Sequence, residues 1–428
     1  MNKLLNKPVI YRRDQHPISR QQIAKSALTV LYGLHKAGYR ALLVGGCLRD
    51  LLRGQEPKDF DVVTNATPEQ VRKVFRNCRL IGRRFRLAHI YFGREIIEVA
   101  TFRADEKGEV SEEGQVIDHN TFGTIENDVL RRDFTLNALY YDIDDFSIID
   151  YVGAMDDIRE GIIRMIGEPA ERYEEDPVRM LRAVRFAAKL NMRIDPAAEQ
   201  AINEKKHLLE HIPSARLFDE TIKLFLSGHA LGSYQELRIH DLFGELFPQA
   251  DSKLKQFDDE HHAYYKSLIK RALKNTDYRV THNEPVTIGF LYAVILWPLY
   301  YDLLKQKLAE GVHWHQAMHD AIDYVFFQAA QRVGIPMRHK SMVRDIWVMQ
   351  SRLTAPNLNK RRIESVLKHK RFRAGFDFLE LRLQAGDNSL QSNHALWSQA
   401  QLDMPEIIME AAAQRRRSSK GKNGRRRQ

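Results

Sequence analysis

The stretch from Ala41 to Asp61, ALLVGGCLRDLLRGQEPKDFD, constrains the fold of this chain more than any other. Ala41 to Val44 have the apolar character of a strand, two glycines interrupt the pattern, and Cys47 to Arg53 predict two helical turns. Adjacent glycines let the backbone approach a ligand closely, and the helix that follows presents unpaired N–H groups. The turn at Gly45 and Gly46 therefore predicts a phosphate-binding site.

A second predicted strand carries Asp59, Phe60 and Asp61. Because side chains alternate across a strand, the two carboxylates are expected on one face and the aromatic ring on the other. Neighbouring carboxylates favour a shared cation, and hard oxygens beside a phosphate favour Mg²⁺. Each motif alone is a weak signal, since a Gly-Gly turn is usually only a turn and Asp-x-Asp is usually a solvated strand edge or loop. Together they indicate two-metal nucleotidyl transfer, in which one ion activates a hydroxyl and the other holds a triphosphate.

Length and composition indicate a globular protein of two or more domains. The chain has 428 residues, of which 43% are hydrophobic and 29% charged. Its two cysteines, Cys47 and Cys78, form neither a disulfide framework nor a metal-binding pair, which favours a reducing cytoplasm. The N-terminus lacks the apolar core of a signal peptide. The longest apolar run, Ile288 to Tyr301, is short and contains Pro298, so no membrane span is expected.

The formal charge of +10 is concentrated at the C-terminus. Arg415 to Gln428 contain eight basic residues and no acid, whereas Met1 to Gln414 carry 58 basic and 56 acidic residues, a net of +2. Such a run is usually disordered and serves either as a solubility tail or as an arm that attracts RNA phosphates. A second basic run, Val71 to Arg86, has seven basic residues and is either a solvated helix face or a contact for RNA or triphosphate.

Further candidate site residues follow the first glycine turn. His89 to Phe92 and Glu95 to Phe102 predict a strand pair that places Glu98 on an otherwise apolar face. Such a carboxylate needs a partner, which is either a metal shared with the aspartates or an arginine such as Arg103. The cluster RRDFTLNA, Arg131 to Ala138, is either a surface ion-pair group or a triphosphate clamp in which Asp133 or Asn137 binds a ribose hydroxyl.

The last cluster, EDPVRMLRAVRF, runs from Glu175 to Phe186. Asp176 and Pro177 predict a helix start, and three arginines recur at every third position, so that all can point one way. These are Arg179, Arg182 and Arg185.

Taken in order, GGCLRD, DFD, IIEVATFR, RRDFTLNA and EDPVRMLRAVRF resemble the class II nucleotidyltransferase superfamily of tRNA CCA-adding enzymes and bacterial poly(A) polymerases. The motifs cover roughly residues 40 to 190. The segment LIGRRFRLAHI, Leu80 to Ile90, and the basic tail favour the poly(A) polymerase branch.

The resemblance implies an α+β fold, with a mixed β-sheet and helices in an N-terminal catalytic head and all-helical neck, body and tail domains. The expected boundaries are a flexible lead-in at 1–20, the head at 21–150, the neck at 151–215, a helical body and RNA-binding region at 216–412, and a disordered tail at 413–428. The second half does contain segments of helical length and spacing, namely Leu217 to Leu226, Ile288 to Leu296 and His315 to Val333.

The resemblance also assigns roles to individual residues. Asp59, Asp61 and Glu98 would bind two Mg²⁺ ions. The nucleotide-binding set would be Gly45, Gly46, Arg49, Arg132, Asn137, Asp176, Arg179 and Arg182, with Asp133 essential beside the ribose.

Hydrogen-bonding chemistry limits what the base-reading pair can do. Adenine and cytosine both offer an amino donor beside a ring-nitrogen acceptor, which a carboxylate and a guanidinium satisfy together. Asp176 and Arg179 would therefore exclude G and U but could not by themselves choose A over C.

The function predicted in this way is template-independent addition of AMP from ATP to RNA 3′ ends, with tRNA CCA addition as the alternative. Two other classes stay open beside the enzyme. A non-catalytic RNA-binding protein would have no reason to keep every metal and nucleotide residue, and a nucleotide-sensing regulator would need the pocket without the RNA surface. The expected partners are ATP, the 3′ ends of mRNA, regulatory RNA and decay intermediates, and RNA-decay proteins; the enzyme is expected to be a cytoplasmic monomer.

Overall fold

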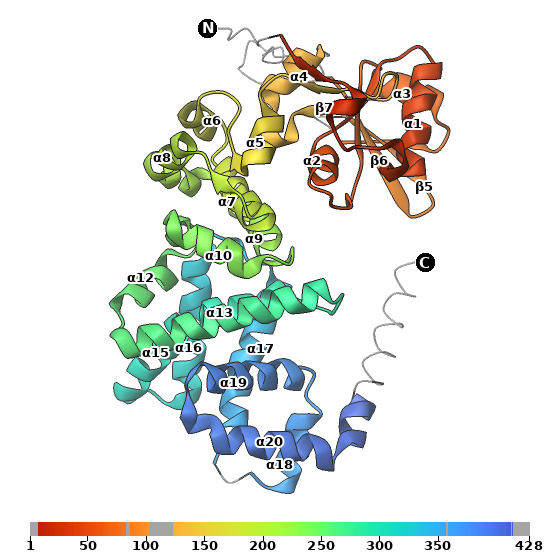
Figure 1. The fold of residues 1–428 in the computed structure, drawn as a ribbon. Helices are drawn as coiled ribbons and strands as arrows, with labels where there is room; N and C mark the ends of the chain where they lie inside the picture. The colour runs from red at the N-terminus through yellow and green to blue at the C-terminus, as the bar shows by residue number, and fades with distance from the viewer. Residues whose placement is uncertain (1–6, 83–85, 103–122, 357, 412, 414–428) are drawn as a thin grey trace, which may run out of the picture. The chain divides into compact units, whose positions relative to one another are not determined.

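A computed structural model describes residues 7–82, 86–102, 123–356, 358–411 and 413 (Figure 1). The chain forms two compact units. The first comprises the residues up to 179 together with 190–205, and the second comprises 180–189 and the residues from 206 onward.

The first unit is built on a mixed sheet, which in the described residues has eight strands in the order β1-β8-β7-β2-β3-β6-β5-β4. The pairing of β3 with β6 is parallel, and the other pairings of this sheet are antiparallel. The mixed-sheet head expected from the sequence is therefore confirmed. The strands are β1 (Val9–Tyr11), β2 (Ala41–Val44), β3 (Asp61–Thr64), β4 (Cys78–Ile81), β5 (Leu87–Phe92), β6 (Glu95–Thr101), β7 (Leu139–Asp142) and β8 (Ile148–Asp150).

Apolar side chains of helices and strands form the core of this sheet. One face of α1, with Ala27, Val30, Leu31 and Leu34, is fully buried against strands β2, β3 and β6. The head helices are α1 (Lys25–Lys36), α2 (Gly46–Leu52), α3 (Pro68–Val74) and α4 (Ile125–Arg131), with short 3₁₀ turns at Arg13–Gln15, Arg20–Gln22 and Thr135–Asn137.

Residues 1–20 differ from the flexible lead-in expected of them. Val9–Tyr11 form the edge strand β1, paired with β8, and Ile18 is fully buried, while residues 1–6 lie outside the described part. The backbone of Val9–Tyr11 is ordered by its hydrogen bonds to β8, and Ile18 is ordered by its burial in the core. Neither contact can be recognised from the local sequence. The basic run from Val71 is also not one helix, because α3 ends at Val74 and β4 begins at Cys78.

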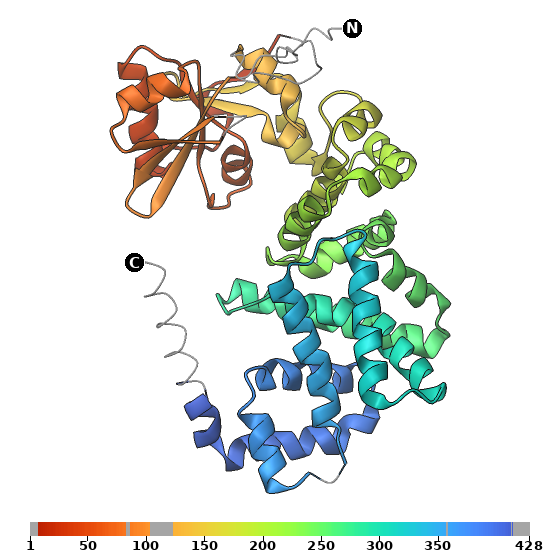
Figure 2. The ribbon, with the colours of Figure 1, turned by 180° about the vertical axis from the view of Figure 1, so that it is seen from behind.

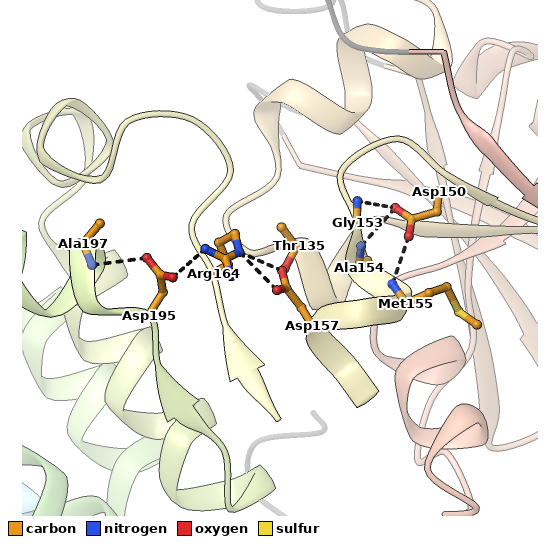
Figure 3. Close-up of polar contacts among 9 residues, drawn as sticks. All are labelled: Thr135, Asp150, Gly153, Ala154, Met155, Asp157, Arg164, Asp195 and Ala197. Carbon is orange, nitrogen blue, oxygen red and sulfur yellow. Dashed lines mark hydrogen bonds and ion pairs between the residues drawn. The ribbon is translucent and has the colours of Figure 1, made fainter. Parts of the chain in front are cut away.

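The range expected to be an all-helical neck, 151–215, also contains a short parallel strand pair, β9 (Ile162–Ile163) with β10 (Arg193–Ile194). Its helices are α5 (Ala154–Glu160), α6 (Pro169–Glu175), α7 (Val178–Leu190) and α8 (Pro196–Lys205), followed by a 3₁₀ segment, Lys206–His211. Asp150 caps α5, since its carboxylate accepts hydrogen bonds from the backbone N–H groups of Gly153, Ala154 and Met155 (Figure 3).

The described part of the second unit is helical, as expected (Figure 2). Its α17 packs against α14 and α19, and Trp347 and Phe378 are buried in this unit. The aromatic residues of α19, including Phe372 and Phe376, are core residues. The helices are α9 (Ser214–Phe225), α10 (Ala230–Ile239), α11 (Leu242–Leu246), α12 (Pro248–Gln256), α13 (Asp259–Thr281), α14 (Ile288–Ile295), α15 (Trp297–Ala309), α16 (Trp314–Ala330), α17 (Met337–Leu353), α18 (Lys360–Leu367), α19 (Phe372–Ala385) and α20 (Gln391–Asp403), with a 3₁₀ turn at Asn388–Leu390.

None of the described helices is by itself long and apolar enough to cross a membrane. Helices α14 and α15 meet those criteria only as a pair joined across a bend of 48°. Of the tail expected at 413–428, residues 414–428 lie outside the described residues.

Candidate active site

The glycine turn lies close to one acidic and one basic side chain. Gly45 follows β2 and caps α2 with φ 84° and ψ −142°, a conformation that side-chain-bearing residues rarely adopt. A Cβ at Gly45 would lie 3.8 Å from Asp61 Oδ2 and 3.9 Å from Arg132 Nη1. The backbone here therefore comes close to both a carboxylate and a guanidinium.

Strand register places two of the predicted carboxylates together. Asp61 begins β3 opposite Val44 of β2, and on its other side it is paired in parallel with Glu98 of β6. Glu98 has a near neighbour in His89, whose Nε2 lies 3.4 Å from Glu98 Oε2; the alternative partner, Arg103, lies outside the described residues. Asp59 precedes the strand instead of lying on it, which corrects the expected alternation, yet its charge still acts on Asp61.

The carboxylates repel one another in this arrangement. Asp61 reaches solvent, but protein surrounds much of it, and this burial together with the charge of Glu98 raises its pKa to about 6; Arg132 acts against the shift and Asp59 adds to it. The thiol of Cys47 lies close by, and burial raises its pKa to about 12. A cation at this position would relieve the repulsion.

The guanidinium of Arg132 is held by two buried side chains, Asp128 and Tyr140. Its Nε donates to the Tyr140 hydroxyl (3.0 Å) and to Asp128 Oδ2 (3.0 Å), and that hydroxyl donates to the same carboxylate oxygen (2.8 Å). Although burial opposes the charge, Tyr140 and Asp128 raise the pKa of Arg132 above its usual value. Arg132 Nη1 also donates to the carbonyl of Asn137 (3.1 Å). The guanidinium is thus fixed in place beside Gly45.

A second network links the α2 helix to the Arg131–Ala138 cluster. Arg49 Nη1 donates to Asn137 Oδ1 (3.0 Å), and Asn137 Nδ2 donates to Asp133 Oδ1 (3.2 Å). Asp133 Oδ1 also accepts from the backbone of Phe134 (2.8 Å). Arg49 is buried and paired with Asp50 (2.7 Å). Two predicted nucleotide-binding residues, Arg49 and Asn137, therefore form one chain of hydrogen bonds with Asp133, the residue predicted to be essential beside the ribose.

The predicted base-reading pair lies in the same unit. Asp176 Oδ1 accepts from the backbone of Val178 (3.2 Å), which caps α7. Arg179 Nη1 donates to Glu175 Oε2 and to the Arg172 carbonyl, both at 2.8 Å. Arg182 belongs to the second unit, so it is not assembled with the others within one unit.

The sequence interpretation missed the residues that hold these groups. Asp128 and Tyr140 support Arg132, and Arg172 joins the neck to the head by donating from Nη2 to the carbonyls of Arg132 (2.9 Å) and Arg131 (3.3 Å). Asp128 and Arg132 are four residues apart, and this spacing could have predicted an ion pair on one helical turn. Tyr140 and Arg172 depend on contacts across the fold.

A different group of side chains is spaced closely enough to hold a metal ion, with donor atoms that all lie within 4.8 Å of one another: His35, Asp142 and Asp144. The three predicted metal-binding carboxylates, Asp59, Asp61 and Glu98, do not meet this distance criterion together. The ring of His35 is engaged within the protein, because Nδ1 pairs with Asp144 (2.7 Å) and Nε2 lies 2.9 Å from the Ala41 carbonyl oxygen. These contacts account for the cluster without an ion.

Comparisons with known proteins match this architecture. Residues 41–164 match the poly A polymerase head domain, residues 191–254 the probable RNA and SrmB-binding site of polymerase A, and residues 310–428 the polymerase A arginine-rich C-terminus. Among solved structures, the CCA-adding enzyme of Bacillus stearothermophilus in complex with CTP aligns with a TM-score of 0.58 at 26% identity, covering 89% of this chain and 82% of that one. The Thermotoga maritima CCA-adding enzyme complexed with tRNA shares the fold, with a TM-score of 0.60 at 20% identity over 93% of this chain and 86% of that one. Fold and site thus define a nucleotidyltransferase of the CCA-adding enzyme superfamily.

Sequence matches that are longer and of higher identity distinguish the poly(A) polymerase branch from the CCA-adding enzymes. The chain is 47% identical to poly(A) polymerase I of Salmonella typhi, covering 98% of this chain and 93% of the relative. It is 42% identical to that of Haemophilus influenzae, covering 88% and 84%. The CCA-adding enzyme of Bacillus licheniformis is 36% identical over 69% of this chain. The chain belongs to the bacterial poly(A) polymerase I family, and its activity is template-independent polyadenylation of RNA with ATP.

Proposed function

We propose that the Gly45 turn, the carboxylates and Arg132 form the catalytic centre for adenylate transfer. The single observation that carries this proposal is the position of Gly45, within 4 Å of both Asp61 Oδ2 and Arg132 Nη1 if a Cβ is added. Phosphate oxygens can approach the bare backbone at Gly45 and meet the fixed guanidinium. The neighbouring carboxylates would hold the cations that accompany a triphosphate.

Asp59, Asp61 and Glu98 are the residues that would hold two Mg²⁺ ions. Their donor atoms are hard carboxylate oxygens, and the raised pKa of Asp61 reflects the mutual repulsion that a divalent cation would relieve. When bound, the ions would activate the RNA 3′ hydroxyl and stabilise the leaving pyrophosphate. The side chain of Asp59 is exposed and precedes β3, where rotation can bring it toward an ion.

The protein residues bind and orient the nucleotide. Arg132, supported by Asp128 and Tyr140, would hold phosphate oxygens, with Gly46 and Arg49 alongside. Asp133 and Asn137 would bind ribose hydroxyls, because their mutual hydrogen bond fixes both side chains next to the phosphate site. Holding the reactants in this way lowers the entropic part of the barrier.

Asp176 and Arg179 would recognise the Watson–Crick edge of the base. A carboxylate acceptor beside a guanidinium donor matches adenine and cytosine and mismatches guanine and uracil. Arg182, on the same helix as Arg179, would contribute positive charge toward nucleotide or RNA.

The RNA 3′ end would be held by the second unit and the basic tail, and the expected substrates are mRNA, regulatory RNA and decay intermediates. The match of residues 191–254 to a probable RNA and SrmB-binding site supports binding of RNA and of a protein partner in this region. We expect that the protein partners act in RNA decay. The two cysteines are free and buried, which agrees with work in a reducing cytoplasm. The enzyme is proposed to act there as a monomer.

The base-reading role is tested by changing Asp176 to Asn. An amide can turn its N–H₂ toward a keto oxygen, which removes one of the two mismatches that exclude UTP and GTP, whereas Arg179 still opposes the ring N–H of these bases. Asp176→Asn should therefore narrow the preference for ATP over UTP and GTP by about tenfold without abolishing it. The measurement is primer extension on an unstructured RNA with each nucleotide in turn and Mg²⁺ present. Asp156→Asn, a change at an exposed ion pair of the same unit, is the control. Unchanged exclusion of UTP and GTP would refute the role.

A further inference from the structure

A cavity in the second unit has no role in the catalytic centre proposed above. It has a volume of about 400 Å³ and lies where α13, α14, α17 and α19 pack on one another (Figure 1). All of its lining residues belong to the second unit. Its volume falls in the range of sites that hold small ligands. The side chains that line it indicate which ligand it can bind.

Part of the cavity lining is apolar. Phe290 of α14, Met342 of α17 and Leu381 of α19 contribute to it, and the last two are buried. The ring of Phe290 is partly buried and packs edge-on against Phe378, with 6.2 Å between the ring centroids. An aromatic ring held among aliphatic side chains suits the flat face of a nucleobase, because every base has an apolar face that can stack.

Asp377 of α19 adds a half-buried carboxylate to the lining. Its side chain is 28% exposed, and Arg373 Nε lies 2.8 Å from its Oδ1. Burial raises the pKa of Asp377, while Arg373 and then Arg279 act against this shift. No second ion pair of Asp377 occurs in the part of the chain that the structure describes. A ligand that donates a hydrogen bond to this carboxylate would therefore stabilise its charged form.

Four cationic residues and two acidic residues line the cavity, namely Arg279, Lys370, Arg371 and Arg373 with Asp377 and Glu380. Arg279 has a separate partner in Glu284 (3.6 Å). Lys370 and Arg371 share one carboxylate, that of Asp345, at 3.3 and 3.5 Å, so together they keep an excess of positive charge. The side chain of Lys370 is 61% exposed and flexible, which suits an approaching phosphate.

We infer that this cavity is a second binding site for an adenylate, separate from the catalytic centre. The base would stack on Phe290, its amino group would donate to Asp377, and the adjoining ring nitrogen would accept from Arg373. Its phosphate would lie at Lys370 and Arg371. Uracil carries a keto oxygen in place of the amino group, which a carboxylate opposes. The inference rests on the proposal that the second unit holds RNA.

Two molecules carry this chemistry, an adenylate of the growing RNA strand and free ATP. If the strand supplies the adenylate, the enzyme binds its own product, and the first adenylates added make the RNA a better ligand. Such binding would keep the RNA engaged while further adenylates are added.

The experiment measures binding of fluorescent oligo(A) and oligo(U) to the full chain by anisotropy, in EDTA so that no nucleotide is added. Ala374→Phe places a ring in the cavity without changing the charge, and Asp377→Ala removes the acceptor. The matched controls, Ala309→Phe and Asp323→Ala, change exposed residues of the same unit outside the cavity. Melting temperatures verify that each variant folds.

The wild type should bind oligo(A) about tenfold more tightly than oligo(U), the size expected for one stacked and hydrogen-bonded base. Ala374→Phe and Asp377→Ala should each lose most of this preference, and both controls should keep it. An unchanged preference in folded Ala374→Phe overturns the inference. If Ala374→Phe does not fold, an unchanged preference in Asp377→Ala overturns it.

Equilibrium dialysis of ATP, with Mg²⁺ but without RNA, identifies the source of the adenylate. Two ATP sites per wild-type chain and one per Ala374→Phe chain would show that free ATP enters the cavity. One site in both, with the oligo(A) preference lost in the variant, would show that the RNA strand does. Failure of the proposed base-reading role appears in primer extension by Asp176→Asn and leaves the oligo(A) preference intact. An unchanged preference in the cavity variants removes only the second adenylate site.

Discussion

Replacing Asp61 by asparagine should abolish adenylate addition and at the same time stabilise the metal-free protein. The substitution keeps the shape of the side chain and removes one negative charge from a group that also includes Asp59 and Glu98. Since the carboxylates repel one another without a cation, the wild-type charge opposes folding. Catalytic residues commonly carry such a cost.

The sign and size of the change in the free energy of unfolding follow from the raised pKa of Asp61, which is about 6 compared with an ordinary 3.8. The folded state binds the proton more tightly than the unfolded state, so the stabilising contribution of the protonated group is complete below pH 4 and is lost as the pH rises to 6. Full conversion of the shift would give about 3 kcal/mol, but the carboxylate reaches solvent, and screening reduces the effect to about 1 kcal/mol. The advantage of Asp61→Asn should therefore develop between pH 4 and 6 and stay constant above that.

The assay combines thermal melts with primer extension. In EDTA at pH 7, Asp61→Asn should melt about 2–4 °C above the wild type. Adding Mg²⁺ should raise the melting temperature of the wild type and leave that of Asp61→Asn unchanged. Turnover within tenfold of wild type, about 1.4 kcal/mol of barrier, would refute the metal-binding role. A melting temperature below wild type in EDTA would refute the electrostatic reasoning.

Three further outcomes are expected. Tyr140→Phe removes the hydroxyl between Asp128 and Arg132, so it should cost about 1–3 kcal/mol in denaturant unfolding and lower kcat/KM for ATP; equal values would show that Arg132 does not need this support. Cys47, with its pKa raised to about 12, should react with iodoacetamide at pH 8 far more slowly in the native protein than in denaturant, as mass spectrometry would show; equal rates would contradict its burial. Deleting Arg415 to Gln428 should reduce the salt dependence of RNA binding by several units of slope, with single-nucleotide addition retained at saturating RNA; an unchanged slope would indicate a solubility tail.

Local sequence patterns predicted the elements that depend on neighbouring residues. The strand pair expected over His89 to Phe92 and Glu95 to Phe102 is observed as Leu87–Phe92 and Glu95–Thr101. The capping box that Thr67 and Gln70 form at the start of α3 is equally local. In these cases turn chemistry, capping and apolar spacing lie within a few residues of the element that they specify.

Features that depend on distant residues could not be predicted. Residues 9–11 read as a lead-in because their partner, β8, lies about 140 residues later in the chain. The run Asp258 to His262 is polar throughout, yet Asp258 caps the long helix α13, whose buried apolar residues begin only at Tyr265. The support of Arg132 by Tyr140 and the bridge made by Arg172 likewise require the tertiary fold.

The parallel pairing of β3 with β6 explains why two carboxylates that repel each other lie side by side in this fold. Adjacent parallel strands require a crossover, and here α3, β4 and β5 provide it, so that Asp61 and Glu98 become direct neighbours. A shift of one residue in this register would move Glu98 to the other face of the sheet, into the positions of Ile97 and Val99, which are buried. The apolar core therefore enforces the register that keeps the two acids together. Stability supplied by the core offsets the electrostatic cost at the site, and this is the arrangement expected where charge is kept for binding a cation and a triphosphate.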